Sequence, residues 1–344
     1  MSKRKTKLVS VDPEHPDEQA IADAAARLRD GQLVAFPTET VYGLGAVALS
    51  SAYVNQIFVA KGRPATNPLI VHIAHIEQAR ELVDEWSEAA RRLAEVFWPG
   101  PLTLVLRRSG VVPDAVCAGL DTVALRMPAH PVARALIDAV GEPLAAPSAN
   151  RSTEISPTTA QHVLRGLDGR IDLVLDAGAT EVGLESTLVS LLDTPIEILR
   201  PGMITRQQLS EVLGDTEIAG HTPQVVDDRQ ARPSPGLSKR HYAPGIPLRL
   251  MERENFSQAL LRDEKTRRRA FIGISSEDTD TSKDEAAARR IWLPPQPKIY
   301  ARQIYAVLHH IDQLDVDEII VEMPPEGDRW AAIRDRLRRA AESE

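Results

Sequence analysis

The chain has 344 residues, of which 43% are hydrophobic and 26% charged, a length and balance that predict two globular domains rather than a disordered chain. Its single cysteine, Cys117, excludes a disulfide framework and zinc sites built on paired cysteines. The formal net charge of -8 disfavours a general attraction to nucleic acid. Any RNA contact would need a local basic patch such as Lys3, Arg4, Lys5 and Lys7, for which a solvated tail is the simpler interpretation.

No apolar run approaches the ~18 residues that a membrane helix needs, and the polar segment from Met1 to Lys7 has no apolar signal core. We therefore expect a cytoplasmic protein that contacts no membrane.

Strand-like and helical patterns alternate through the first part of the chain, which predicts an α/β domain over residues 14–213. Apolar runs predict strands at 33–36, 69–73, 102–106, 121–128, 172–175 and 187–191. Three-to-four spacing predicts helices at 51–60, 76–97 (bent) and 131–140, and a short helix at 205–213 capped by Thr205 or Ser210.

Prolines then interrupt a polar stretch, so residues 214–246 are predicted to form a linker that acts as a lid or a tether. A second α/β pattern fills residues 247–344, with strands at 247–251, 270–274, 290–293 and 318–322 and helices near 255–262, 298–311 and 328–341. Strands separated by helices favour parallel pairing with right-handed crossovers.

Residues 36–45 predict a strand that opens into a hydroxyl-rich and glycine-rich loop, which suits a small polar ligand. Residues 43–48 also mimic a dinucleotide-binding fingerprint. A polar stretch precedes them, however, and no acidic residue follows ~20 positions later to hold a ribose, so we reject that interpretation.

Several cations end strands or helices among serines and threonines: Lys61, Arg63, Arg126 and Arg200. Taken by themselves, Lys61 and Arg63 would indicate only a solvated helix end. His72 by itself would indicate a core or edge histidine whose hydrogen bonds are satisfied within the protein. Arg126, in an apolar strand, needs an anionic partner, either a carboxylate or a ligand. With no phosphate-binding P-loop pattern and no Ser-His-Asp arrangement, the pattern indicates a polyanion site without a covalent nucleophile.

Six segments together resemble the YrdC-like threonylcarbamoyl-AMP synthase family: residues 37–45, 61–64, 67–72, 147–150, 185–187 and 200–202. Residues 234–236 and 241–244 look like the linker of its long form. The resemblance implies a twisted mixed-sheet YrdC-like domain followed by a smaller Rossmann-like α/β domain. It also implies synthesis of threonylcarbamoyl-AMP and pyrophosphate from L-threonine, bicarbonate and ATP, with Mg²⁺ on the phosphates. A tRNA modification machinery would accept this product and use it to form N6-threonylcarbamoyladenosine beside the anticodon, and the chain itself could make a weak tRNA contact.

The resemblance assigns roles by matching motifs. The ATP side would comprise Arg63, Asn67, Thr122, Ser148, Ser156, Arg200 and Tyr242. The threonine side would comprise Thr40, His72, Arg126, Ala146 and Ser186, with Lys61 between them and with Lys61 and Arg63 as the catalytic cations; no metal-ligating side chains are implied. One departure from the family pattern concerns Thr153, in the loop that leads to Ser156, where the family usually has glycine.

Two other functions compete with this interpretation. A carbamoyl-adenylating hydrogenase maturation factor would carry cysteine-rich zinc modules, which a single cysteine argues against. An RNA- or tRNA-binding protein without catalysis would be expected to show interleaved basic and aromatic residues, which this acidic chain lacks.

Overall fold

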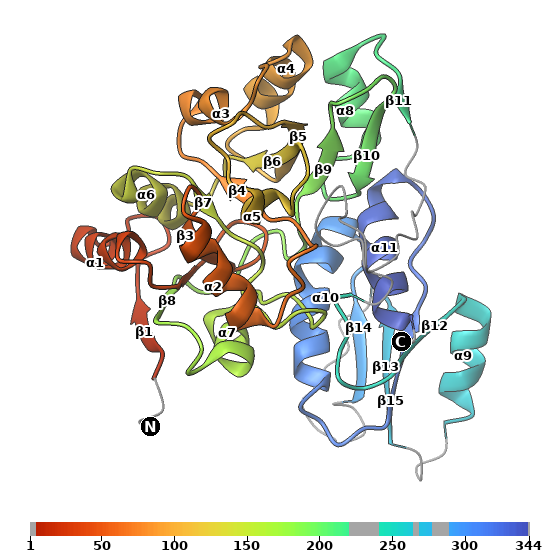
Figure 1. Ribbon diagram of the computed structural model, residues 1–344. Helices are drawn as coiled ribbons and strands as arrows, with labels where there is room; N and C mark the ends of the chain where they lie inside the picture. The colour runs from red at the N-terminus through yellow and green to blue at the C-terminus, as the bar shows by residue number, and fades with distance from the viewer. Residues whose placement is uncertain (1–4, 220–240, 264–267, 277–288, 343–344) are drawn as a thin grey trace.

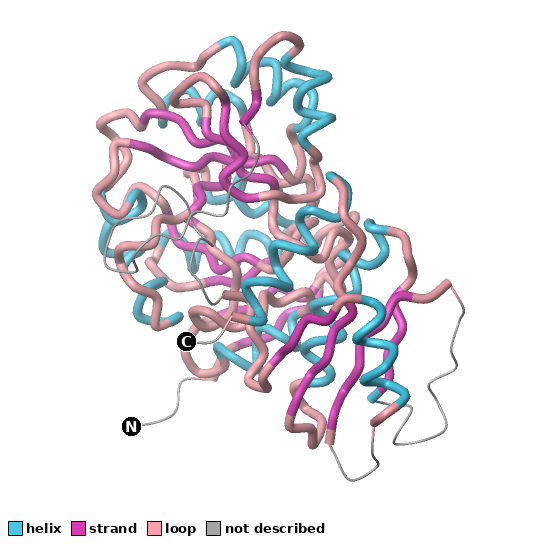
Figure 2. The backbone as a smooth tube through the Cα atoms, turned by 90° about the vertical axis from the view of Figure 1, so that its right-hand side faces the viewer, coloured by secondary structure: helices cyan, strands magenta, loops and turns pink. Residues whose placement is uncertain are grey.

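The computed structural model describes residues 5–219, 241–263, 268–276 and 289–342, and these form two sheets that lie side by side (Figures 1 and 2). The larger sheet has the strand order β1-β8-β2-β3-β7-β4-β6-β5-β9-β10-β11, and the smaller has the order β12-β15-β13-β14. We call residues 5–219 the first unit and the described residues from 248 to 342 the C-terminal unit.

The first unit mixes parallel and antiparallel pairs, as in β5 with β9 and β5 with β6. Its strands are β1 (Lys7–Ser10), β2 (Val34–Phe36), β3 (Gly43–Val47), β4 (Ile70–His72), β5 (Leu102–Arg107), β6 (Thr122–Arg126), β7 (Leu144–Ala145), β8 (Leu173–Asp176), β9 (Thr187–Ser190), β10 (Ile196–Arg200) and β11 (Ile218–Ala219).

Helix ends in the first unit follow local sequence signals. The helices are α1 (Glu18–Arg29), α2 (Ser51–Lys61), α3 (Ile76–Leu82), α4 (Glu88–Phe97), α5 (Asp114–Cys117), α6 (Pro131–Val140), α7 (Ala160–Leu167) and α8 (Arg206–Leu213). Ser50 accepts a hydrogen bond from the Tyr53 amide at the start of α2, and Gly62 ends that helix with a φ of 62°. Thr205 caps α8, which confirms one of the two predicted caps. The bend predicted within 76–97 is the break between α3 and α4.

The C-terminal unit has strands β12 (Leu248–Met251), β13 (Arg269–Ile274), β14 (Arg290–Leu293) and β15 (Glu318–Glu322), and all their pairings are parallel, as predicted. Its helices are α9 (Arg253–Leu261), α10 (Pro297–Ile311) and α11 (Ala331–Ala341), with the short η2 (Asp328–Trp330) before α11.

The two units share buried apolar contacts. Val41, Ile155 and Leu184 of the first unit belong to the same buried cluster as Tyr300, Ile304 and other core residues of the C-terminal unit. The C-terminal unit therefore docks through its own core onto loops of the first unit, and α10 lies on the side that faces those loops (Figure 1).

The structure corrects one prediction. Gly43 and Gly45 lie in a fully buried strand rather than in the predicted loop, which covers only residues 37–42, although Gly43 still lines a pocket together with Thr40 of that loop. A Cβ on Gly45 would lie 2.8 Å from the ring of Phe36, so this glycine is needed for close strand packing.

The first sheet extends beyond the predicted range 14–213 at both ends, because β1 and β11 belong to it. Residues 220–240 of the predicted linker, with the segment 234–236, lie outside the described residues, as do Lys3 and Arg4 of the predicted basic arm. In the described part of the chain, no helix is long and apolar enough to cross a membrane.

Candidate active site

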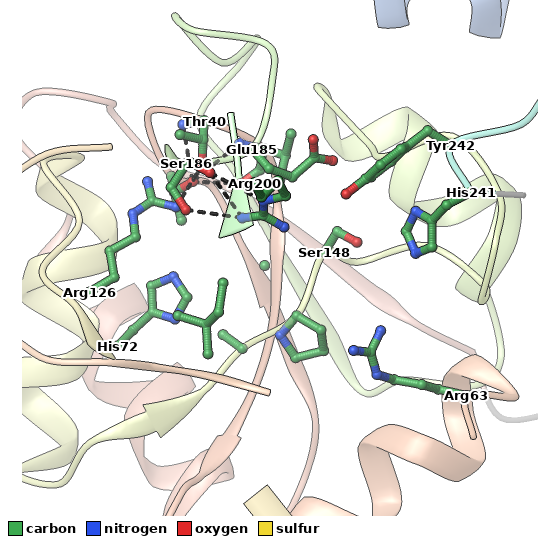
Figure 3. Close-up of a pocket in the computed structure, with 16 residues that line it drawn as sticks. Thr40, Arg63, His72, Arg126, Ser148, Glu185, Ser186, Arg200, His241 and Tyr242 are labelled. Carbon is green, nitrogen blue, oxygen red and sulfur yellow. Dashed lines mark hydrogen bonds between the residues drawn. The ribbon is translucent and has the colours of Figure 1, made fainter. Parts of the chain in front are cut away.

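A pocket lies at the ends of β4, β6 and β10, where His72, Arg126 and Arg200 end their strands. Arg126 and His72 lie toward one end, and Arg63, His241 and Tyr242 toward the other, with Ser148 and Arg200 between them (Figure 3). The pocket therefore has two ends, each with at least one guanidinium group.

Arg126 and Thr40 form the polar part of the first end. Arg126 Nη1 donates to Thr40 Oγ1 at 2.9 Å, and Arg126 Nη2 lies 2.6 Å from Glu39 Oε1 in a buried ion pair. Thr40 Oγ1 also shares a hydrogen bond of 2.8 Å with Thr38 Oγ1. The anionic partner that the sequence required for Arg126 is thus Glu39, which holds the guanidinium in place.

His72 pairs in register with Arg126 on the neighbouring strand. Burial, aided by the charge of Arg126, lowers the pKa of His72 to about 3, so the imidazole is neutral at pH 7. Its buried Nδ1 has no hydrogen-bond partner among the described residues. A buried polar atom that faces a pocket without a partner is typical of a ligand contact.

Arg200 and Ser186 connect the two ends. Arg200 donates from Nε and Nη2 to the Ser186 carbonyl at 3.2 and 3.1 Å, and from Nη2 to Ser186 Oγ at 3.2 Å. Ser186 Oγ also shares a 2.7 Å hydrogen bond with Thr103 Oγ1. These contacts fix the Arg200 guanidinium through neutral acceptors.

The other end is built by Arg63, His241 and Tyr242. Arg63 donates from Nε to the Asn67 carbonyl at 3.1 Å and from Nη2 to the Pro68 carbonyl at 2.9 Å, so the short loop after α2 fixes its side chain. Tyr242 is 1% exposed and stacks on Tyr305, yet its hydroxyl has no partner within the described part of the chain. Burial raises the pKa of Tyr242 and lowers that of His241 well below its usual value.

Comparison with known proteins identifies the family. Residues 26–202 match the family model described as Telomere recombination, and residues 204–342 match that of the threonylcarbamoyl-AMP synthase C-terminal domain. The threonylcarbamoyl-AMP synthase of Pyrococcus abyssi is 42% identical over 335 residues, which cover 95% of this chain and 96% of that protein. The chain belongs to the threonylcarbamoyl-AMP synthase family.

Solved structures and shorter relatives extend the comparison. The crystal structure of P. abyssi Sua5 complexed with L-threonine is 41% identical, covers 98% of each chain and matches with a TM-score of 0.88. This likeness confirms the predicted fold class. The putative threonylcarbamoyl-AMP synthase of Mycobacterium tuberculosis (strain CDC 1551 / Oshkosh) is 38% identical over 203 residues, 59% of this chain and 93% of that protein. That family member is too short to hold both units.

Nine residues that the family resemblance selected line the pocket: Thr40, Arg63, His72, Arg126, Ala146, Ser148, Ser186, Arg200 and Tyr242. The other four lie elsewhere. Asn67 and Ser156 are buried behind the wall, where Asn67 accepts from Arg63 and Ser156 Oγ donates to Glu185 Oε1 at 2.5 Å. Thr122 is at the opposite end of β6 from Arg126, roughly 13 Å along the strand.

Lys61, assigned as a catalytic cation, is 2% exposed and does not line the pocket. Its Nζ donates to the carbonyl of Ser148 at 2.5 Å and to that of Asn150. Burial, with the nearby charge of Arg63, lowers its pKa well below the usual value. In this arrangement Lys61 supports the loop that carries Ser148 rather than reaching the pocket.

Sequence reasoning missed Glu39 and Glu185 as site residues and named His241 only as part of the linker, although each is next to a residue that it selected. Glu185 and His241 line the pocket, whereas Glu39 acts behind it on Arg126. The sequence signal that could have identified these residues is their position directly beside a predicted site residue. The deviating Thr153 has a φ of 72°, a conformation that favours glycine, and its carbonyl accepts from the Ala243 amide at 3.0 Å. The loop that leads to Ser156 therefore also holds the segment that carries Tyr242.

Proposed function

We propose that this chain forms threonylcarbamoyl-AMP and pyrophosphate from L-threonine, bicarbonate and ATP. The observation that carries the proposal is the convergence of three guanidinium groups and several buried, unpartnered polar atoms of the described residues on one two-ended pocket in a member of this family. Such a pocket can hold two anionic substrates beside each other, which is what the reaction requires.

Threonine is assigned to the end built by Thr40, His72, Arg126, Ala146 and Ser186. The amino-acid carboxylate would meet the Arg126 guanidinium, and the side-chain hydroxyl would exchange hydrogen bonds with the neutral groups around it. A crystal structure of the P. abyssi relative is complexed with L-threonine, which supports this substrate. Ala146 offers only a methyl group, so the backbone there is open to close approach.

ATP is assigned to the other end. Arg63, Ser148, Arg200 and Tyr242 line it, and Asn67 and Ser156 act from behind by fixing Arg63 and Glu185. Thr122 does not line the pocket, and its connection with the site is that it lies on the same strand as Arg126.

The chemistry needs positioning more than proton transfer. The threonine amine and bicarbonate give a carbamate and water, and a carbamate oxygen then forms a bond to the α-phosphorus of ATP. The bond from that phosphorus to the bridging oxygen breaks, and pyrophosphate leaves. Since the attacking oxygen is already anionic, no general base is required, and Arg63 and Arg200 would offset the charge of the phosphates. Lys61 contributes by holding the carbonyls of Ser148 and Asn150.

A resident Mg²⁺ does not fit the described residues. No group of three or more His, Cys, Asp or Glu side chains there is placed to hold a metal ion. Among those residues, Glu185 is the one carboxylate that lines the pocket, and it already accepts hydrogen bonds at both oxygens. Mg²⁺ in this reaction would therefore arrive on the triphosphate of ATP.

The product is a mixed anhydride that water destroys, so a second activity must consume it promptly. We assign that role to a tRNA modification machinery that transfers the threonylcarbamoyl group to adenosine beside the anticodon, and place the reaction in the cytoplasm, where tRNA is available.

Formation of threonylcarbamoyl-AMP and pyrophosphate by the purified chain tests the proposal. Both products should require L-threonine, bicarbonate and ATP together, so omission of each in turn is the control. Binding of tRNA without pyrophosphate release would favour the competing RNA-binding function and refute catalysis.

A second measurement tests the amino-acid end. Against L-threonine, 2-aminobutyrate lacks the hydroxyl and serine lacks the methyl group. A site that hydrogen-bonds the hydroxyl should reject 2-aminobutyrate strongly, by ~10⁴-fold in kcat/KM, and serine by only ~10–200-fold. Equal use of 2-aminobutyrate and threonine would show that the hydroxyl is not read and would refute the assignment of Thr40 and Ser186.

A further inference from the structure

A buried arginine of the C-terminal unit touches the back of the pocket wall. Arg336 lies on α11, is 1% exposed and does not line the pocket. Its Nε donates to Glu185 Oε2 at 2.8 Å, and its Nη2 donates to the Pro201 carbonyl at 3.1 Å. Its Cζ also lies 5.1 Å from the ring centroid of Tyr242. One guanidinium thus contacts three neighbouring parts of the wall from behind.

Each of these three contacts leads to the end assigned to ATP. The other carboxylate oxygen of Glu185, Oε1, accepts a hydrogen bond from Ser156 Oγ at 2.5 Å. The Pro201 carbonyl follows Arg200 directly in the chain. Tyr242 presents its hydroxyl to the pocket, and its ring packs against Arg336 and Tyr305. Among the described residues, no hydrogen bond or ion pair joins Arg336 directly to the threonine end, although Ser186 of that end follows Glu185 in the chain.

The Glu185 carboxylate, which accepts from Arg336, has a second partner in the C-terminal unit. Tyr305 on α10 donates to Glu185 Oε2 at 3.2 Å, so two helices of the C-terminal unit bind one side chain of the first unit. Burial alone would raise the pKa of Glu185, but the charges of Arg336 and Arg200 outweigh it and hold that pKa below its usual value. Glu185 is therefore an ionised acceptor that depends on Arg336 for its charge balance.

The backbone on either side of Glu185 is also fixed by the C-terminal unit. Gly183 lies so close to α10 that a Cβ there would be 2.6 Å from the Ala301 carbonyl oxygen, and Leu184 is fully buried in the core shared with that unit. Glu185 and Ser186 line the pocket, and the backbone just before them is fixed where the two units meet.

We propose that Arg336 is a positioning residue through which the C-terminal unit sets the geometry of the ATP end of the pocket. This inference rests on the proposed function and deepens it by giving the C-terminal unit a role in the reaction. A guanidinium suits that role, because its planar fork binds a carboxylate and a carbonyl at fixed angles while its face lies over an aromatic ring. Asp335 Oδ2, 2.6 Å from Arg336 Nη1, fixes the third side of the fork.

Shorter family members show why such a residue is informative. The relative from M. tuberculosis matches 59% of this chain over 93% of its own length, so it is too short to contain both units. In the present chain, loss of the C-terminal unit would remove both the Arg336 guanidinium and the Tyr305 hydroxyl from the Glu185 carboxylate.

Steady-state kinetics of Arg336→Met, with ATP and threonine varied separately, test the proposal. We expect the KM for ATP to rise by at least ~10-fold while the KM for threonine changes less than ~2-fold, because the groups that Arg336 contacts directly, Glu185, the Pro201 carbonyl and Tyr242, lie on the ATP side, and Thr103 and Arg200 still hold Ser186. A purely structural role would lower the active fraction, and hence kcat, without separating the two KM values. Equal changes in both KM values, or a change in kcat alone, would overturn the inference.

Three further variants keep the test decisive. Arg338→Met, an exposed position on the same helix, should behave as wild type in both KM values. Tyr305→Phe removes only one hydrogen bond to Glu185 and should raise the KM for ATP in the same direction by a smaller factor, even if Arg336→Met fails to fold. Arg336→Lys keeps the charge but loses the fork, so it should recover only part of the loss.

A double-mutant cycle identifies the route. If Arg336 acts through Glu185, the rise in KM for ATP in Arg336→Met with Glu185→Gln should be much smaller than the product of the two single effects. If the effects of the two single variants on the KM for ATP multiply in the double variant, Arg336 does not act through Glu185, and that part of the proposal is overturned. An inactive wild-type chain would instead refute the proposed function, so the two failures are distinguishable.

Discussion

Gly183→Ala probes the close approach of the two units. Gly183 has a φ of 78°, and a Cβ there would lie 2.6 Å from both the Ala301 carbonyl oxygen and the Arg302 Cα of α10. The left-handed conformation costs an alanine about 1–2 kcal/mol. Forcing α10 away adds about 1–3 kcal/mol, as overpacking does in protein cores. We therefore expect the variant to lose about 2–5 kcal/mol of unfolding free energy.

Gly141→Ala is the matched control. Gly141, at the end of α6, has nearly the same φ, 79°, but a Cβ there would meet no described atom within 4 Å. It should lose only the conformational part, about 1–2 kcal/mol. Urea denaturation followed by circular dichroism measures both variants against wild type. Equal losses in the two variants would refute the argument, because they would mean that α10 does not approach Gly183 as closely as the structure indicates.

Three other predictions concern the pocket and its protonation. Arg63→Lys keeps the charge but loses the planar fork that the Asn67 and Pro68 carbonyls hold in place, so pyrophosphate release should slow by ~10-fold or more, and near-normal turnover would refute the role of Arg63. Tyr242→Ala should weaken ATP binding and speed hydrolysis of the product, whereas Tyr242→Phe isolates the hydroxyl; if the alanine variant accumulated product like wild type, Tyr242 would not cover the site. Burial lowers the pKa of His309 to about 4, and burial together with the Arg126 charge lowers that of His72 to about 3. As the pH drops from about 6.5 toward about 4, these histidines therefore take up protons in the unfolded chain before they do so in the folded one, and the free energy of unfolding should fall. Denaturation midpoints of wild type and His309→Gln across that range check this, and a midpoint independent of pH would contradict it.

Hydrophobic periodicity predicted most of the fold, because buried strands and amphipathic helices carry their own signal. The ranges 131–140, 290–293 and 318–322 match α6, β14 and β15. Elements with weaker patterns were missed. β1 is a largely exposed edge strand, and β3 consists of small residues whose role depends on the facing Phe36 ring. Such packing comes from tertiary contacts that no local pattern contains.

The candidate site could be predicted where its residues belong to local motifs. Arg63 and Arg126 were selected from their own segments, and the structure brings both to one pocket. The support for the wall could not be predicted in this way. Glu185 and Arg336 are separated by 151 residues, and the sequence around each gives no sign that it is buried. Only the docking of the two units makes their charges depend on each other.

The distribution of charge along the pocket is consistent with the proposed order of the substrates. At the threonine end, Arg126 is paired with the carboxylate of Glu39, so little net positive charge faces a small ligand. At the middle, Arg200 donates its hydrogen bonds to the neutral carbonyl and hydroxyl of Ser186, while its charge also acts on the nearby Glu185 carboxylate. A triphosphate carries more negative charge than an amino-acid carboxylate and needs the stronger field. Each end has one ion-paired carboxylate, Glu39 on Arg126 and Glu185 on Arg336, but among the described lining residues the Arg63 and Arg200 guanidinium groups belong to the side assigned to ATP. The graded field therefore favours one orientation, with the carbamate held between Arg126 and the α-phosphate.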